Sequence, residues 1–279
     1  METLLILMAL PWALGSLLKH SNSYFYKLNI SYCGNNYFGW QKQKTAGIET
    51  IQGTLEEKLN ELSKGALINT IGSGRTDTGV HAISQVVRVE MKAPFPKEMF
   101  LKGINNLLPS DIRINGCSET NQDFHPVFGA KEKTYVYAFS NNSSKPFFSR
   151  RWLTYNKEVD IELMSKGARL FEGNHDFSNY MCVGTEVKST VRHVKSCQLR
   201  KSQNIDLGEC KIEGNFYLLE ITGNGFLKQM VRLIVGSLIA LNERKIFVSD
   251  IEESLKVMDG KKLGATVPGH GLYLKSVTY

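Results

Sequence analysis

The stretch GSGRTDTGVHA, from Gly72 to Ala82, places one carboxylate and one guanidinium close together in a glycine-rich segment. Asp77 follows Arg75 by two residues, and strand-like sequences, ALINTIG and SQVVRVEM, lie on either side. The stretch is therefore predicted to connect two strands, or a strand and a turn, in a sheet. Its glycines permit backbone angles closed to other residues and let a large ligand approach the main chain.

The residue types of this segment allow three interpretations. A lone Asp in a glycine-rich turn most often caps a backbone amide. A phosphate-binding loop is the second interpretation, but the stretch lacks the Gly-Lys-Ser/Thr ending of a P-loop and does not lead into a helix. The third is a catalytic loop, in which Arg75 grips a phosphate or pairs with the carboxylate of Asp77. The stretch alone does not decide among them.

The composition is that of an ordinary globular protein, with 42% apolar and 22% charged residues in a chain of 279. The formal net charge is +7 and the pI is about 9.0, which favours a polyanionic partner. The five cysteines are widely spaced, without a C-x-x-C pair, so we expect neither a disulfide framework nor a zinc site. No histidine spacing is typical of a metal site, and no metal is expected.

An apolar segment opens the chain at residues 1–23. Its core, Leu4 to Leu18, is shorter than the roughly 20 residues that span a bilayer, and Pro11 interrupts it. It resembles the apolar part of a signal peptide, although Glu2 stands where basic residues are expected. Three interpretations stay open: an overlong start, an organelle-targeting leader or a secretory signal. We expect a cytoplasmic protein that does not cross a membrane, or an organellar one if the segment is a leader.

Strands and helices are mixed along the rest of the chain. Period-two alternation predicts strands, and apolar residues at helical spacing predict helices. The strands are expected at Tyr24–Gly34, 66–72, Ser84–Met91, 111–119, Lys133–Ser140, 215–223 and 271–279, and the helices at 51–62, Phe95–Pro109, Ile161–Phe171, Gly225–Leu241 and Val248–Lys256.

The mixture predicts an α+β protein built from two similar sheet-and-helix halves, because strand-plus-helix units stand on both sides of Asn121. The pattern loosens between Asn121 and Lys133, where we place a domain boundary. The expected parts are the N-terminal extension at residues 1–23, an N-terminal α+β domain at residues 24–124 that carries the Asp77 loop, and a C-terminal α+β domain at residues 125–279.

One arginine lies inside the strongly apolar helix predicted at residues 225–241. Arg232 stands between Val231 and Leu233, and Lys228 is one turn before it on the same side. Arginine is rarely fully buried unless it is paired. Arg232 therefore either marks the solvent edge of the helix or points into a cleft, where it pairs with a carboxylate or an anionic ligand.

Two further groups each have a structural and a functional interpretation. Tyr135, Tyr137 and Phe139 share one face of a predicted strand, which is either sheet core or, at a cleft rim, a surface on which a base stacks. His175 and Asp176 are adjacent, and they form either a catalytic dyad or a loop in which both cap backbone amides. A glycosidase or nuclease would need a second carboxylate or a metal cluster beside the first carboxylate, and the sequence places none there.

The motifs of the chain, taken in order from Tyr24 to Tyr279, resemble those of the TruA family of tRNA pseudouridine synthases. They are YCGNNYFGWQKQ with TIQGTLEEKL, then GSGRTDTGVHA, KEKTYVYAF, FEGNHDFSNY, GNGFLKQMVRLIVGSL and PGHGLYLKSVTY. The string Gly-Arg-Thr-Asp-x-Gly-Val-His-Ala is highly specific. Thr78 stands where the family more often has Ala, and the apolar residues 1–23 have no family counterpart.

The resemblance implies a fold, a reaction and a partner. The fold is two α+β halves that form one extended, mostly antiparallel sheet, with a positively charged cleft between them. The reaction isomerises uridine to pseudouridine without a metal or organic cofactor, usually at positions 38, 39 and 40 of the anticodon stem-loop of tRNA. The active form is a homodimer in which one tRNA contacts both subunits. A non-catalytic RNA-binding protein that kept the fold is the rival hypothesis.

The resemblance also implies roles for individual residues. The catalytic Asp falls on Asp77, the active-site tyrosine on Tyr135 and the family's basic residue on Arg232. Arg75 is implied to hold the displaced nucleotide, and the other residues expected at the substrate-binding surface are Lys228, Gly74, Gly79 and His81. In this chemistry the uridine leaves its stack, and Arg232 keeps Asp77 ionised by its opposite charge. Tyr135 stacks on the uracil and helps to remove the C5 proton.

Overall fold

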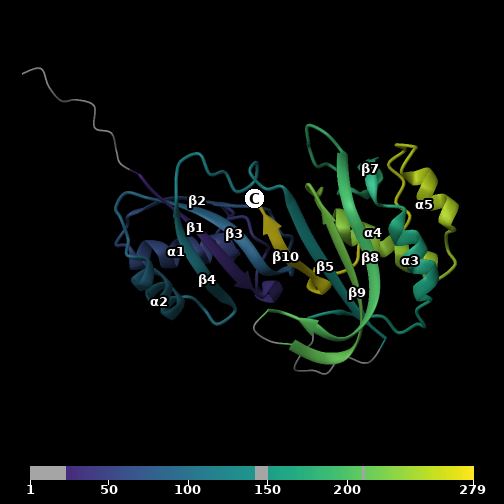
Figure 1. Cartoon of the computed structure of the whole chain (residues 1–279), viewed down its shortest axis with the longest axis horizontal. Helices are drawn as coiled ribbons and strands as arrows, with labels where there is room; N and C mark the ends of the chain where they lie inside the picture. Colours follow the sequence, from purple (N-terminus) through teal and green to yellow (C-terminus); the bar gives the residue numbers. More distant parts are fainter. Residues whose placement is uncertain (1–22, 142–149, 209–210) are drawn as a thin grey trace, which may run out of the picture.

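The computed structural model describes residues 23–141, 150–208 and 211–279. The predicted N-terminal extension, apart from Ser23, lies outside the described residues. In the described part, the strands form one ten-stranded sheet that is mixed but mostly antiparallel (Figure 1). The α+β class and the single, mostly antiparallel sheet are therefore confirmed.

The elements follow one another as strands with interspersed helices. The strands are β1 (Tyr24–Tyr32), β2 (Leu67–Gly72), β3 (His81–Met91), β4 (Ile112–Thr120), β5 (Glu132–Ser140), β6 (Leu153–Thr154), β7 (Gly173–Asp176), β8 (Val191–Asp206), β9 (Lys211–Gly223) and β10 (Leu272–Thr278). The helices are α1 (Ile51–Leu62), α2 (Lys97–Leu107), α3 (Ile161–Arg169), α4 (Met230–Asn242) and α5 (Val248–Ser254), with short 3-10 turns η1 (Gly34–Asn36), η3 (Ser178–Tyr180) and η4 (Gly269–Gly271).

The helix that carries Arg232 begins later than the sequence predicts. α4 starts at Met230 rather than at Gly225, because Gln229 adopts a left-handed backbone conformation with φ of 64°, which an α-helix does not contain. The prediction that Lys228 lies one turn before Arg232 on the same helix face is therefore wrong. Lys228 belongs to the segment that leads into the helix.

The last strand of the chain, β10, lies in the middle of the sheet. The strand order is β4-β1-β3-β10-β5-β9-β8-β7, with β2 paired to β3 and β6 paired to β5. Leu274 of β10 pairs in parallel with Ala82 of β3 and antiparallel with Tyr135 of β5. Because neighbouring strands are about 4.8 Å apart, this register holds Tyr135 about 10 Å from the end of the Gly72–Ala82 loop.

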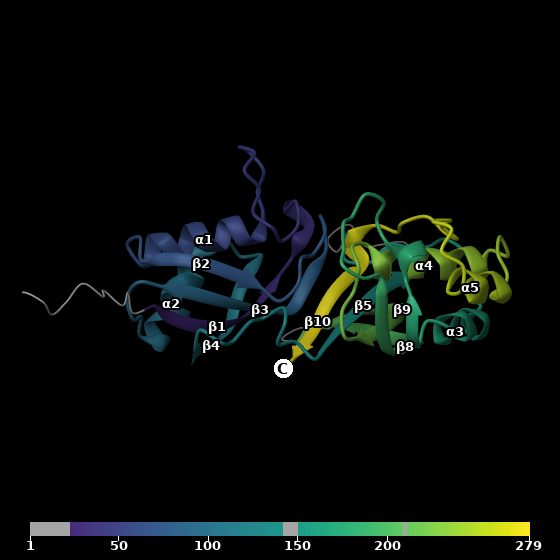
Figure 2. The same ribbon diagram turned by 90° about the horizontal axis from the view of Figure 1, so that it is seen from above.

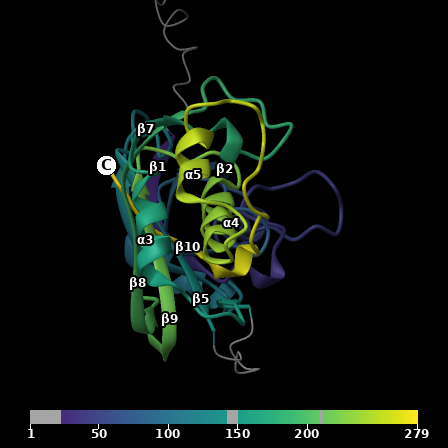
Figure 3. The ribbon, with the colours of Figure 1, turned by 90° about the vertical axis from the view of Figure 1, so that its right-hand side faces the viewer.

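Helices pack on the sheet near both of its ends (Figure 2), and Figure 3 faces the end that carries α3, α4 and α5. α1 contacts β2 and α2, and α2 contacts β4, whereas α3 contacts β8 and α4, and α4 contacts β5. On β5, Tyr135, Tyr137 and Phe139 are buried in the large apolar core, which confirms the shared face predicted for them. Val136 and Ala138 point to the other side of the strand and join a second, smaller core.

Helix α4 approaches the chain before β10 so closely that only glycines fit. A Cβ added to Gly236 would lie 1.9 Å from the carbonyl oxygen of Ala265, and one added to Gly264 would lie 2.2 Å from the carbonyl oxygen of Gly236. The same segment presents the carbonyl of Val267, which accepts a hydrogen bond of 2.8 Å from Nε of Arg232. The contact between the two backbones therefore fixes the position of the Arg232 side chain.

We expect Gly236→Ala to lower the free energy of unfolding by about 1–3 kcal/mol, because the added methyl group forces two backbones apart. Gly103→Ala on α2 is the matched control, since its methyl group meets only the end of the Leu62 side chain. Urea denaturation of both variants measures the difference. Equal stabilities of the two variants would show that the close approach is not a constraint.

Candidate active site

The loop between β2 and β3 that carries Asp77 is held by hydrogen bonds from three other segments. The backbone N–H of Trp40 donates to the Thr76 carbonyl at 3.0 Å. The hydroxyls of Tyr32 and Thr76 lie 2.8 Å apart, and Nε2 of Gln85 donates to the Gly74 carbonyl at 2.7 Å. With so many of its groups hydrogen-bonded, the loop presents Asp77 on a fixed backbone.

Asp77 forms an ion pair with Arg232. Nη1 of Arg232 lies 2.8 Å from Oδ2 of Asp77, and the two side chains are 14% and 21% exposed. Arg232 lies in the first turn of α4 and also donates from Nε to the Val267 carbonyl. The structure thus favours the second interpretation of this arginine, in which it points into a cleft and pairs with a carboxylate. A partly buried pair of this kind is costly to break, because the remaining charge loses its partner.

Tyr135 of β5 also lies beside the loop, near Gly74. Its hydroxyl oxygen is 3.7 Å from the position that a Cβ on Gly74 would take, and its ring packs edge-on against Phe226 with a centroid distance of 5.2 Å. Burial, and then the negative charge of Asp77, raise the pKa of Tyr135 above its ordinary value. The phenol therefore keeps its proton at neutral pH and acts there as a flat apolar surface with one hydrogen-bond donor.

These groups line one cleft of about 1230 Å³. The cleft is bounded by the Asp77 loop, by β5, and by the segment that leads into α4 together with its first turn. Of the residues predicted for the site, it is lined by Gly74, Arg75, Asp77, Tyr135, Lys228 and Arg232. Residues 155 positions apart, Asp77 and Arg232, thus meet in one site.

The structure does not bring Gly79 or His81 to this cleft. Gly79 lies in the turn at the end of the loop with φ of 77°, in the left-handed region that favours glycine. His81 is 2% exposed; its Nδ1 accepts a hydrogen bond of 3.1 Å from the Gly34 N–H, and its Nε2 lies 3.1 Å from the His270 carbonyl. His81 is a brace between η1, β3 and η4.

Lys133 also lines the cleft, although it was not among the residues predicted for the site. Its Nζ donates to the Ser73 carbonyl at 2.6 Å, and burial lowers its pKa. It precedes Tyr135 by two residues on β5, and residues two apart on a strand face the same side. Alternation from Tyr135 is thus the signal that could have identified Lys133.

Asp176 caps a backbone amide, as the structural interpretation of the His175 and Asp176 pair predicts, whereas His175 bonds to a carbonyl, and neither residue lines the cleft. Asp176 accepts hydrogen bonds of 2.8 Å from the Ser178 N–H and from the Thr190 hydroxyl. Nε2 of His175 lies 2.7 Å from the Glu172 carbonyl. Across residues 23–141, 150–208 and 211–279, no cluster of His, Cys, Asp or Glu is arranged to hold a metal ion. Within the same ranges, no helix has the length and apolar character that a bilayer crossing requires.

Comparison with known proteins identifies the family. A family model described as tRNA pseudouridine synthase matches residues 29–129 and 168–279, more than half of the chain. The chain belongs to the tRNA pseudouridine synthase A family. Its activity is that of a tRNA pseudouridine synthase, an isomerase.

Relatives named tRNA pseudouridine synthase A match this chain over most of its length. The protein of Caldicellulosiruptor bescii is 36% identical over 253 residues, which cover 90% of this chain and 98% of the relative. That of Acetivibrio thermocellus is 38% identical over 255 residues, 91% of this chain and 98% of the relative. A chain in the crystal structure of a Cbf5-Nop10-Gar1 complex matches 89% of this chain and 48% of its own length, with 12% identity and a TM-score of 0.30.

Burial, followed by the positive charge of Arg151, lowers the pKa of His81 to about 4, from an ordinary value of about 6.5. At a pH between these two values, the unfolded chain therefore binds a proton at His81 that the folded chain does not bind. The contribution of neutral His81 to the free energy of unfolding is therefore fully present above about pH 6.5, and it is lost as the pH falls toward about 4.

We expect the free energy of unfolding to fall between pH 7 and pH 5 by about 2 kcal/mol more for the native protein than for His81→Gln. Urea denaturation at both pH values measures each decrease, and all other titrating groups cancel in the comparison. Parallel pH dependences of the two proteins would show that His81 is not held neutral.

Proposed function

We propose that this enzyme isomerises uridine in the anticodon stem-loop of tRNA, at positions 38, 39 and 40, with Asp77 as its essential carboxylate. The observation that carries this proposal is the ion pair of Asp77 with Arg232, in a cleft that Tyr135 also lines. We further propose that the protein acts as a cytoplasmic homodimer without metal or organic cofactor, for which the family resemblance is the support.

The reaction breaks the bond between N1 of the base and C1′ of the ribose, turns the uracil and joins C5 to C1′. C5 loses its proton and N1 ends with one, so the reaction is an isomerisation and needs no oxidant. The uridine has to leave its base stack first, because the reacting atoms are not accessible within a helix. Asp77 then acts either by adding to the ribose or the uracil ring, or by stabilising positive charge as the bond breaks.

Arg232 prepares the carboxylate for this role. Its guanidinium places an opposite charge 2.8 Å from the carboxylate in a partly buried site. It engages Oδ2, whereas no hydrogen bond reaches Oδ1 from the residues that the structure describes. Oδ1 is therefore the oxygen that we assign to the substrate.

Tyr135 and the basic side chains act on the substrate rather than on the carboxylate. The protonated Tyr135 is suited to stack on the uracil and to donate a hydrogen bond, so we assign to it the positioning of the base. Four cationic side chains line the cleft against the carboxylates Asp77 and Glu186: Arg75, Lys133, Lys228 and Arg232. This excess of positive charge supports a cleft that binds the phosphates of RNA, with Arg75 holding the displaced nucleotide.

We also propose that residues 24–124 and residues 125–279 form the two expected domains. Each contributes to the cleft, since Asp77 comes from the first and Arg232 from the second. Strand β10 ties them together, because it ends the chain and yet pairs with β3 as well as with β5. The site would then lie where the two domains meet.

Asp77→Asn should bind tRNA and form no pseudouridine, because the amide is neutral and cannot act as the carboxylate does. Tritium release from tRNA labelled at C5 of uridine measures turnover, and filter binding measures affinity. Transcripts with cytidine at positions 38, 39 or 40 test the target positions. Measurable turnover by Asp77→Asn would refute the role of Asp77.

Arg232→Ala should lower the turnover rate by roughly 100- to 1000-fold, the effect of removing one positioned charge from an active site. Arg244→Ala is the matched control, because Arg244 also pairs with a carboxylate, Asp160, at 2.8 Å but is 62% exposed. Turnover and the urea midpoint are measured for both. If Arg232→Ala loses stability without a specific loss of turnover, the arginine is only a structural partner.

A further inference from the structure

The cleft carries an exposed aromatic side chain, Phe38, that has no part in the reaction proposed for Asp77. In the sequence YFGW, Tyr37 and Trp40 are buried, whereas Phe38 between them is 55% exposed. Phe38 lines the same cleft as Arg75 and Asp77. An aromatic ring is thus presented to solvent in the cleft that holds the carboxylate of Asp77.

The backbone on both sides of Phe38 is attached to the Asp77 loop. The Trp40 N–H donates to the Thr76 carbonyl at 3.0 Å, and the Gly79 N–H donates to the Tyr37 carbonyl at 3.4 Å. Gly39 has φ of 92°, and a Cβ there would lie 2.5 Å from the Thr76 carbonyl oxygen. The backbone that carries Phe38 is consequently fixed relative to the Asp77 loop.

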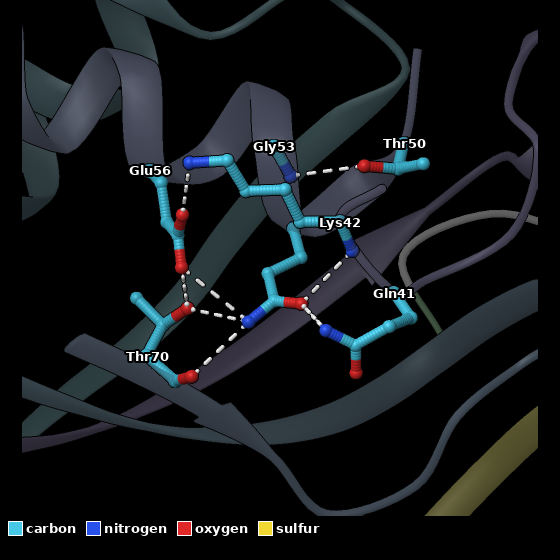
Figure 4. Close-up of polar contacts among 7 residues, drawn as sticks. Gln41, Lys42, Thr50, Gly53, Glu56 and Thr70 are labelled. Atoms are coloured by element: carbon cyan, nitrogen blue, oxygen red, sulfur yellow. Dashed lines mark hydrogen bonds and ion pairs between the residues drawn. The ribbon is translucent and has the colours of Figure 1, made fainter. Parts of the chain in front are cut away.

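The chain that follows the exposed ring is braced against α1 and β2 (Figure 4). Oε1 of Gln52 accepts hydrogen bonds from Gln41 Nε2 at 2.6 Å and from the Lys42 N–H at 3.0 Å. Nε2 of Gln52 donates to the Thr70 carbonyl at 3.1 Å. Nζ of Lys42 pairs with Glu56 at 2.8 Å. These contacts order the backbone that follows Phe38, so little backbone conformational entropy is lost when a ligand packs on the ring.

The chemistry of the ring selects its partner. Phenylalanine has no polar atom, so Phe38 cannot grip a phosphate or a ribose hydroxyl. Its flat face is suited to stacking on a nucleobase, as aromatic side chains do when proteins bind single-stranded or splayed RNA. The other exposed apolar side chains of the cleft, Val127 and Val187, are aliphatic and offer no such face.

Displacing a uridine from its stack leaves the neighbouring base without a stacking partner. We propose that Phe38 replaces the displaced uridine as the stacking partner of the adjacent base. This inference rests on the proposed function, since it needs a uridine drawn from its stack into the Asp77 cleft. Phe38 thereby holds the RNA strand in register while the uracil turns.

The test compares Phe38→Ala and Phe38→Trp with Phe247→Ala. Phe247 is the control because it is 70% exposed at the start of α5 and does not line the cleft. We expect Phe38→Ala to lower kcat/KM on an anticodon stem-loop by about 5- to 150-fold, the range of one lost base–aromatic stack. Phe38→Trp should restore most of the activity, and Phe247→Ala should behave as the native protein. Urea midpoints of all three exclude a folding defect.

A second readout does not depend on turnover. In an Asp77→Asn background, a stem-loop carries 2-aminopurine on either side of the target uridine, a base whose fluorescence falls when it is stacked. At one of the two positions, the probe fluorescence should stay low when the Asp77→Asn variant binds. It should be high when the variant that also carries Phe38→Ala binds. If the native protein forms no pseudouridine while the probe fluorescence still depends on Phe38 in this way, the proposed function is refuted and the stacking role is supported.

Three results would overturn the inference. Phe38→Ala with native kcat/KM would show that the ring does not act on the RNA, and unchanged probe fluorescence at both positions would show that no flanking base stacks on it. A change in oligomeric state in size-exclusion chromatography, with native kinetics per active site, would assign the ring to a contact between copies of the chain.

Discussion

The ion pair between Asp77 and Arg232 is the interaction on which the site depends. It joins the loop that follows β2 to the first turn of α4. Further hydrogen bonds position each partner: those to the Asp77 loop, and that from Arg232 to the Val267 carbonyl. Neither charge is left alone in a partly buried place, where it would be costly. The pair therefore has two effects: it ties two distant segments together, and it places a carboxylate with a guanidinium partner at the wall of a cleft.

The path of the last strand makes this meeting possible. β10 inserts between β3 and β5, so that the end of the Asp77 loop and Tyr135 are separated by only one strand. The chain just before β10 packs against Gly236 and presents the Val267 carbonyl to Arg232. One segment near the C-terminus thus sets the positions of the carboxylate, the tyrosine and the arginine relative to one another.

Local patterns in the sequence drew attention to most of these groups, and the family resemblance then assigned them to one site. The glycine-rich stretch marked Asp77, period-two alternation marked the face of Tyr135, and a charge within an apolar run marked Arg232. Lys228 was misplaced, because periodicity alone does not reveal the left-handed residue Gln229 that delays the start of α4.

Other features could not be predicted because they depend on contacts between distant segments. The place of β10 in the sheet is a pairing of residues far apart in the chain, and no local pattern encodes it. His81 looks like a ligand-binding residue in its motif, but three segments enclose it. Lys133 and Phe38 gain their significance only from lying beside the Asp77 loop.

The most direct measurement is a crystal structure of Asp77→Asn bound to an anticodon stem-loop. The account predicts a uridine outside its stack, with the side chain of residue 77 within about 3.5 Å of C1′ of the ribose or of the uracil ring, and with Tyr135 against the base. A uridine that stays stacked in the stem-loop, or one bound away from the pair of residues 77 and 232, would contradict it.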